Sequence, residues 1–331
     1  MTKQYPDGWY QIARSREVAK KPLRRLFQDT PLVLFRSNGK ISALHDRCPH
    51  RSARLSDGQI VGGNIECPYH GWQFDGAGIC KLVPLHEGKV PRNLVPALQT
   101  HETAGLIFLR SGVAGPALPH TPDWVGPDFL KMIIPMSTRT TLVDLAENAF
   151  EPIHSLFVHK NISRGLSGQR SEVRIKLSGG DDRVYMTMQG EKRQDGLMSK
   201  FFESSRSITK AALIAPGIME TQYWNGDRLT LIATLYFTPA KSDLMTGYAV
   251  MQAPRQWGLG YIKAALFWPF LKLLLRQDKI MLRNTHENWE DFGRPVHANS
   301  PLDFLRPHVE SVLRNERPTV ADHPQEFTLK L

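Results

Sequence analysis

Cysteine is scarce in this chain, which has only Cys48, Cys67 and Cys80 among its 331 residues. So few thiols exclude a disulfide framework and favour a reducing, cytoplasmic compartment. The first residues, MTKQYPDGWY, contain no apolar run of the kind found in secretory signal peptides. We therefore expect a cytoplasmic protein without a signal peptide.

Several other signals are missing as well. No basic helix, aromatic interleaving or recognised motif indicates nucleic-acid binding, although the formal net charge is +10. The most apolar stretch, residues 261–275, is too short and too often broken by lysine and proline to span a bilayer. We expect it to pack in the core, with a pocket cover or a membrane-surface contact as the alternatives. The sequence also has no flavin or nicotinamide motif, so a redox reaction would need electrons from another protein.

The length suggests two domains. Residues 1–115 contain short strand-like runs between turns, and the clearest pair, 32–35 and 41–44, is joined across an Asn-Gly step that is typical of hairpins. A Gly- and Pro-rich stretch at 112–122 predicts the boundary between a first domain, 1–115, and a second, 116–331.

The second domain mixes helices with strands. Hydrophobic periodicity predicts strands at 184–188, 229–237 and 247–251. It predicts a helix at 144–158 and a long helical segment at 261–289, which we expect Pro269 to interrupt.

Positive charge is concentrated in the first domain, where sixteen Lys and Arg stand against nine Asp and Glu. Two interpretations explain this excess equally well. One is a generally solvated basic surface, and the other is a docking face for an acidic electron donor, which the opposite charge would steer.

The strongest motif consists of two short stretches, Cys48-Pro49-His50 and Cys67-Pro68-Tyr69-His70-Gly71-Trp72, with sixteen residues between His50 and Cys67. Two thiolates and two imidazoles are the ligands of a Rieske [2Fe–2S] cluster, whose neutral imidazoles raise its potential above that of all-cysteine ferredoxins. A structural zinc site uses the same ligand types but usually pairs like with like, whereas each pair here is mixed. The spacing therefore favours a one-electron centre, and we expect Trp72 to pack beside it.

These residues and their neighbours, CPHRSARLSDGQIVGGNIECPYHGWQFDGAGIC, resemble the Rieske domain of the Rieske-type non-haem iron oxygenases. The resemblance implies an α+β chain in which a β-rich Rieske domain precedes a helix-grip (START-like) catalytic domain. It also implies that Cys48, His50, Cys67 and His70 hold the cluster.

A second segment resembles the iron-site motif of the same family. It runs from Glu147 to His159 and contains H-x₄-H, while residues 276–282 resemble the segment that supplies a third ligand. By this resemblance His154, His159 and Asp278 bind a mononuclear Fe(II), since two histidines and one carboxylate form the facial triad of such oxygenases. A regular helix would place Glu147, Glu151 and His154 on one face but would splay the two histidines, so we expect the helix to end or bulge between them.

The resemblance also gives roles to two residues near this site. Glu151 occupies the position of an acid that links the iron ligand to a cluster histidine, here His70, of a neighbouring subunit. The family most often has Asp there, and the extra methylene of Glu changes its reach. Asn148 is expected to stabilise the site from behind the ligands.

Taken together, the resemblance implies the terminal oxygenase component of a Rieske system, a homotrimer arranged head to tail. It would use O₂ and electrons from an acidic ferredoxin or NAD(P)H-dependent reductase to hydroxylate or oxidatively demethylate a small hydrophobic molecule. A cis-dihydroxylating dioxygenase, a Rieske electron carrier without oxygenase activity and a ligand-binding module without turnover remain as alternatives.

Overall fold

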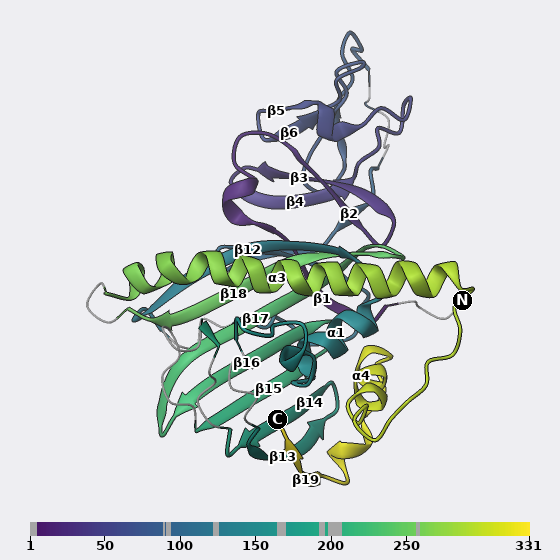
Figure 1. Ribbon diagram of the computed structural model, residues 1–331. Coiled ribbons are helices and arrows are strands. Elements are labelled where there is room, and N and C mark those ends of the chain that lie inside the picture. The colour runs from purple at the N-terminus through teal and green to yellow at the C-terminus, as the bar shows by residue number, and fades with distance from the viewer. Residues whose placement is uncertain are drawn as a thin grey trace. The chain divides into compact units, whose positions relative to one another are not determined.

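The structure is a computed structural model that describes residues 5–88, 90, 94–121, 126–163, 170–191, 196–197, 207–255 and 259–331 (Figure 1). The chain divides into two compact units. The smaller unit comprises Asp7–Thr121 and Thr238–Ser242, and the larger unit comprises Met1–Pro6, Pro122–Phe237 and Asp243–Leu331.

The smaller unit is built from three small sheets with the strand orders β1-β11-β10, β2-β3-β4-β9 and β5-β6-β7-β8. Its strands are β1 Gly8–Arg14, β2 Leu23–Phe27, β3 Thr30–Ser37, β4 Lys40–His45, β5 Gln59–Val61, β6 Asn64–Glu66, β7 Gln73–Phe74, β8 Cys80–Leu82, β9 Ala97–Leu98, β10 Thr100–Thr103 and β11 Leu106–Ser111. The predicted hairpin is confirmed: β3 pairs with β4 in an antiparallel register that closes at Ser37 and Lys40. Asn38 and Gly39 form its turn, both at positive φ, which is the geometry that an Asn-Gly step favours.

The larger unit is an eight-stranded sheet with helices on one face. The strand order is β12-β18-β17-β16-β15-β14-β13-β19. Its strands are β12 Phe129–Arg139, β13 Glu172–Gly180, β14 Arg183–Gln189, β15 Ile208–Ile214, β16 Ile218–Asn225, β17 Arg228–Lys241, β18 Leu244–Pro254 and β19 Gln325–Lys330. The described helices are α1 Leu142–Phe150, α3 Leu259–Asp291 and α4 Arg306–Leu313.

Two hydrophobic clusters attach the helices to the sheet. One joins α1 and α4 to β13, β14 and β15, and includes Phe150, Ile175 and Val309. The other joins α3 to β12 and β18 around Ile134 and Leu271, and Figure 1 shows α3 lying along this side of the sheet. An antiparallel sheet with a long helix packed against it is the α+β, helix-grip arrangement that the family resemblance implied.

Two of the predicted helices differ from the structure. The predicted helix at 144–158 is wrong in its second half, because α1 ends at Phe150 and Glu151 is extended, with φ −81° and ψ 138°. Pro152 explains this ending, because a proline disfavours the helical conformation of the residue before it. The expectation that Glu147, Glu151 and His154 share one helix face is wrong for the same reason.

The second difference concerns Pro269. The helix α3 continues through this residue for 33 residues in all, so the predicted interruption is wrong. Part of the apolar stretch 261–275 faces inward, including the buried Leu271, whereas Tyr261, Ile262 and Leu266 are exposed. None of the helices in the described residues is both long and apolar enough to cross a membrane.

Candidate metal centres

The first candidate centre lies in two turns of the smaller unit, each held by its own backbone. The amide of Cys48 donates to the carbonyl of Ala53, and the carbonyl of Cys48 accepts from the amide of Ser52. In the second turn Cys67 donates to Trp72 and accepts from Gly71, whose φ of 70° suits glycine. Both cysteines are buried, with exposed fractions of 1% and 2%. The turns therefore place two thiols side by side in the core.

The two histidines of these turns lie at the surface. His50 and His70 are exposed, and their ring centroids are 4.6 Å apart. The ring of Trp72 stacks on His50 at 4.9 Å and 9°, which confirms the packing expected for Trp72. Burial, together with the neighbouring Cys67, raises the pKa of the Cys48 thiol to about 11. Two buried cysteine thiols, beside two imidazoles in contact with each other, fit the donor set of a Rieske cluster.

The second candidate centre lies in the larger unit. His154 begins a short 3-10 turn, His154–Leu156, just after α1, and His159 follows it in the chain. Asp278 comes from the middle of α3. The Nε2 atoms of His154 and His159 lie 3.8 and 3.2 Å from Oδ1 of Asp278. One ligand atom from each of the three residues lies within 4.8 Å of the others. A single cation could therefore contact all three.

Neighbouring acceptors fix the orientation of both histidines. Nδ1 of His154 lies 2.6 Å from Oε1 of Glu151, and Nδ1 of His159 lies 3.0 Å from Oε1 of Gln277. A carboxylate or an amide oxygen only accepts, so each Nδ1 carries the proton and each Nε2 keeps a lone pair for a metal. Within the described residues, Oδ1 of Asp278 is buried and has no hydrogen-bond donor. Such an orphaned oxygen between two imidazole lone pairs fits a metal ligand set.

Glu151 is occupied by its own segment. Besides His154 Nδ1, its carboxylate accepts the backbone amide of Ile153 at 2.5 Å and that of His154 at 2.9 Å. The side chain is 20% exposed. This carboxylate therefore holds the turn that follows α1 and also orients a candidate ligand.

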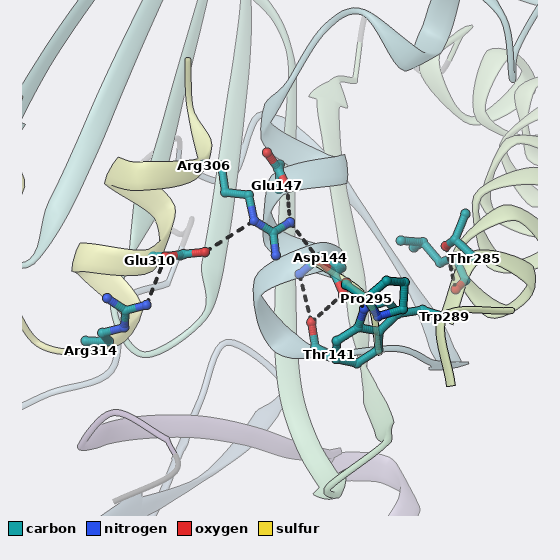
Figure 2. Close-up of polar contacts among 10 residues, drawn as sticks. Thr141, Asp144, Glu147, Thr285, Trp289, Pro295, Arg306, Glu310 and Arg314 are labelled. Atoms are coloured by element: carbon teal, nitrogen blue, oxygen red, sulfur yellow. Dashed lines mark hydrogen bonds and ion pairs between the residues drawn. The ribbon is translucent and has the colours of Figure 1, made fainter. Parts of the chain in front are cut away.

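Arg306 of α4 pairs with two acidic side chains of α1, Asp144 and Glu147, as Figure 2 shows. Its Nη1 lies 2.9 Å from Asp144 and 2.7 Å from Glu147, although these residues are far away in sequence. Thr141 caps the first turn of α1 by accepting the amide of Asp144. Burial raises the pKa of Glu147, and the neighbouring Arg306 opposes that rise. The position of α1, and of the turn that carries His154, therefore depends on α4.

A cavity of about 780 Å³ lies between the sheet and the helices of the larger unit. His154, His159 and Asp278 form part of its wall, as do Glu151 and Asn148. Most of the remaining wall is apolar, and it includes the side chains of Met136, Met186, Met188, Met245 and Met251. An apolar pocket with a few convergent polar groups is the usual form of a small-molecule site.

The structure thus brings His154, His159, Asp278 and Glu151 together and places Asn148 in the same cavity wall. It gathers Cys48, His50, Cys67 and His70 in two adjoining turns. Sequence reasoning missed Gln277 and Arg306. Gln277 directly precedes a proposed ligand, which is a usable signal, whereas nothing near Arg306 points to α1.

Comparisons with known proteins identify a family for the part of the chain that contains the first candidate centre. The Rieske [2Fe-2S] domain family matches residues 8–100. The oxygenase component of dicamba O-demethylase from Stenotrophomonas maltophilia is 35% identical over 62% of this chain and 62% of its own length. The 4beta-methylsterol monooxygenase of Methylococcus capsulatus is 35% identical over 36% of this chain and 35% of its own length. The chain thus matches less than two thirds of the length of these curated relatives.

Solved structures extend the likeness of fold to nearly the whole chain. A crystal structure of dicamba monooxygenase bound to dicamba covers 95% of this chain and 97% of its own, with a TM-score of 0.78 and 24% identity. A structure of Pseudomonas putida NdmA with caffeine covers 92% of this chain and 89% of its own, with a TM-score of 0.74 and 19% identity. Both units of this chain therefore have counterparts in one protein fold.

Proposed function

Since the chain belongs to the Rieske-type non-haem iron oxygenases, we propose that it is a terminal oxygenase that hydroxylates or oxidatively demethylates a small hydrophobic molecule. The observation that carries the proposal is the convergence of His154, His159 and Asp278 in the wall of an apolar cavity. When bound, the cluster supplies single electrons and the mononuclear iron activates O₂. Relatives named as a demethylase and as a monooxygenase support one-oxygen chemistry over dihydroxylation.

Each residue of the candidate centre has a defined task in this proposal. His154, His159 and Asp278 hold the iron, while Glu151 and Gln277 keep the two Nδ1 protons in place so that both Nε2 atoms face inward. The apolar wall excludes water and holds the substrate beside the ligands. Cys48, Cys67, His50 and His70 hold the cluster, with the thiols buried and the imidazoles at the surface.

We also propose the assembly and partners that the family resemblance implies. A head-to-tail homotrimer would let a cluster histidine approach the Glu151 of a neighbouring subunit, using the part of that side chain that stays exposed. An acidic ferredoxin or reductase in the cytoplasm would deliver the electrons, and the basic charge of residues 1–115 favours such a donor.

The proposal is tested by metal analysis of anaerobically purified protein. Wild type should contain about three irons and two acid-labile sulfides per chain, and His154→Ala should keep the sulfide and lose about one iron. O₂ uptake with candidate substrates would follow. About two irons in both proteins would contradict the oxygenase and support an electron carrier.

A further inference from the structure

Several hydroxyl groups in the cavity wall already give their protons to the protein. Ser155 donates to the carbonyl of Pro152, and Thr138 donates to that of Lys279. Thr230 donates to the carbonyl of Tyr223, and Thr209 donates to the carboxylate of Glu191. A hydroxyl has one proton and two lone pairs, so each of these oxygens can only accept a hydrogen bond from a ligand.

Two of these residues, Thr209 and Thr230, lie together on the sheet. We call their side-chain groups the far-end hydroxyls, because they lie at the end of the cavity remote from the metal ligands. Thr209 on β15 is the Cα partner of Tyr223 on β16. Thr230 on β17 donates to the carbonyl of the same Tyr223 at 2.8 Å. The far-end hydroxyls therefore flank Tyr223 from its two neighbouring strands.

The far-end hydroxyls are distant from the metal ligands. The carbonyl of Lys279, which follows Asp278, accepts from Thr138 at 3.3 Å. The Cα partner of Thr138 is Met245, which lies at the start of β18, just after the end of β17. Thr230 lies near the start of β17, roughly 35 Å of strand away from that end. The cavity is therefore elongated, with the ligands at one end and a pair of hydrogen-bond acceptors at the other.

The charges around the cavity disfavour an anionic ligand. The cations among its described wall residues, Lys272, Arg276 and Lys279, all have exposed side chains. Lys272 extends over the ring of Trp268 at 4.9 Å. Behind Thr209 lies the buried carboxylate of Glu191, which is 4% exposed. A carboxylate or phosphate at the far end would meet acceptor oxygens and negative charge and would lose its hydration without compensation.

We propose that the substrate is an uncharged, elongated and mainly apolar molecule with an O–H or N–H group at the end remote from the carbon that is oxidised. The assignment of the reacting end rests on the proposed function, whereas the binding preference rests on the cavity alone. The far-end hydroxyls accept the hydrogen bond from this polar group, and the apolar wall holds the rest of the molecule. A ligand with an ether or a carboxylate in that place lacks the donor and binds more weakly.

Binding measurements on the purified full chain test this preference without turnover. The rod-shaped hydrocarbon diphenylhexatriene, which has no hydrogen-bonding group, serves as a fluorescent probe of the cavity, and decan-1-ol, decyl methyl ether and decanoate compete with it. We expect decan-1-ol to displace the probe at roughly 3- to 10-fold lower concentration than the ether, and decanoate to be the weakest. Equal displacement by the alcohol and the ether in wild type would overturn the proposal.

Variants test whether the far-end hydroxyls cause the preference for the alcohol over the ether. In Thr209→Val/Thr230→Val the alcohol and the ether should become equal within about twofold, because a methyl group replaces each accepting oxygen and covers the Tyr223 carbonyl and the Glu191 carboxylate behind it. Unchanged affinity for diphenylhexatriene shows that the cavity of the variant is intact. Thr187→Val is the matched control, because Thr187 lies between Met186 and Met188 on β14 and points to the other face of the sheet. It should keep the preference for the alcohol.

The outcomes separate this inference from the proposed function. A preference for the alcohol that survives in the double variant would overturn the far-end assignment. Three irons per chain together with no alcohol preference would overturn only the inference. Two irons per chain together with a preference that the double variant abolishes would overturn only the oxygenase, because the cavity would still select the same ligands.

Discussion

The two candidate metal centres are built in opposite ways. The cysteines and histidines of the smaller unit belong to two turns in one short stretch of chain, and each turn is closed by its own backbone hydrogen bonds. The ligands of the larger unit come from the turn after α1 and from α3, more than one hundred residues apart, and Arg306 of a third helix holds α1 in place. Local sequence therefore determines the first centre, whereas packing between distant helices determines the second.

The difference implies that the two centres should respond separately to substitution. Changes in α1, α3 or α4 should empty or loosen the mononuclear site and leave the acid-labile sulfide of the cluster unchanged. The sulfide content of each variant is therefore an internal control for the mononuclear iron, and any loss of both together would contradict the comparison.

The largest difference between the responses of the two centres is expected for Asp278→Asn. An amide is a much weaker metal ligand than a carboxylate, so mononuclear iron should fall from about one to roughly a tenth per chain, with at least a 100-fold loss of turnover. Metal analysis and O₂ uptake measure the two effects. Asp291→Asn, at the exposed end of the same helix, is the control and should behave as wild type.

A smaller effect is expected for Glu151→Gln. The amide can present only one oxygen to the three N–H groups that the carboxylate now accepts, so His154 loses its fixed orientation. Removal of such a partner typically weakens metal binding by about 10- to 100-fold. Titration with Fe(II) under anaerobic conditions measures this. Iron affinity equal to that of wild type would show that Glu151 does not orient the ligand.

Arg306→Met should act at a distance. Without the guanidinium, Asp144 and Glu147 remain partly buried as neighbouring acids, which we expect to destabilise the larger unit by about 1–3 kcal/mol and to weaken iron binding modestly. Urea unfolding followed alongside iron content measures both. Arg314→Met is the matched control, because Arg314 pairs only with Glu310 in the described residues and is 61% exposed, and should change stability by less than about 0.5 kcal/mol.

The smallest effect is a pH dependence in the smaller unit. The hydrogen bond from Arg36 lowers the pKa of Glu102 below its ordinary value of 4.5. As the pH falls, Glu102 therefore becomes protonated at a higher pH in the unfolded chain than in the folded protein. The stabilisation that the Arg36–Glu102 pair contributes is complete above about pH 4.5 and is lost as the pH falls through the lower pKa of the folded protein. Arg36→Met should cost about 0.5 kcal/mol at pH 7 and less at pH 3, as thermal melts at the two pH values would measure.

The control for this pH dependence is Lys40→Met, which removes an exposed cation at the start of β4. Its effect on the melting temperature should not change with pH in the same window. A cost for Arg36→Met that stays constant down to pH 3 would show that packing of the arginine stem, rather than its pairing with Glu102, contributes the stability.

The sequence predicts the locally encoded parts of the molecule well. The hairpin around Asn38-Gly39, the three strands predicted at 184–188, 229–237 and 247–251 and the stacking of Trp72 all depend on neighbouring residues, and the structure confirms them. The other five strands of the large sheet were not predicted. The division at residue 115 and the roles of the site residues stay predictions.

The errors have physical causes. Our prediction gave the helical periodicity at 144–158 more weight than Pro152. The sequence did contain the contrary signal, because a proline disfavours the helical conformation of the residue before it, here Glu151. Pro269 was given too much weight, because tertiary contacts of α3 with the sheet maintain the helix around it. The contacts of Arg306 with α1 had no signal in the sequence, since they exist only after α4 packs.

The continuity of α3 links two parts of the cavity wall mechanically. One unbroken helix carries both Trp268 and Asp278 in the cavity wall. The wall that a substrate would contact and the carboxylate that would hold the metal therefore belong to one rigid element. A substitution that shifts α3 against the sheet at Trp268 should also alter the distances from Asp278 to the two histidines.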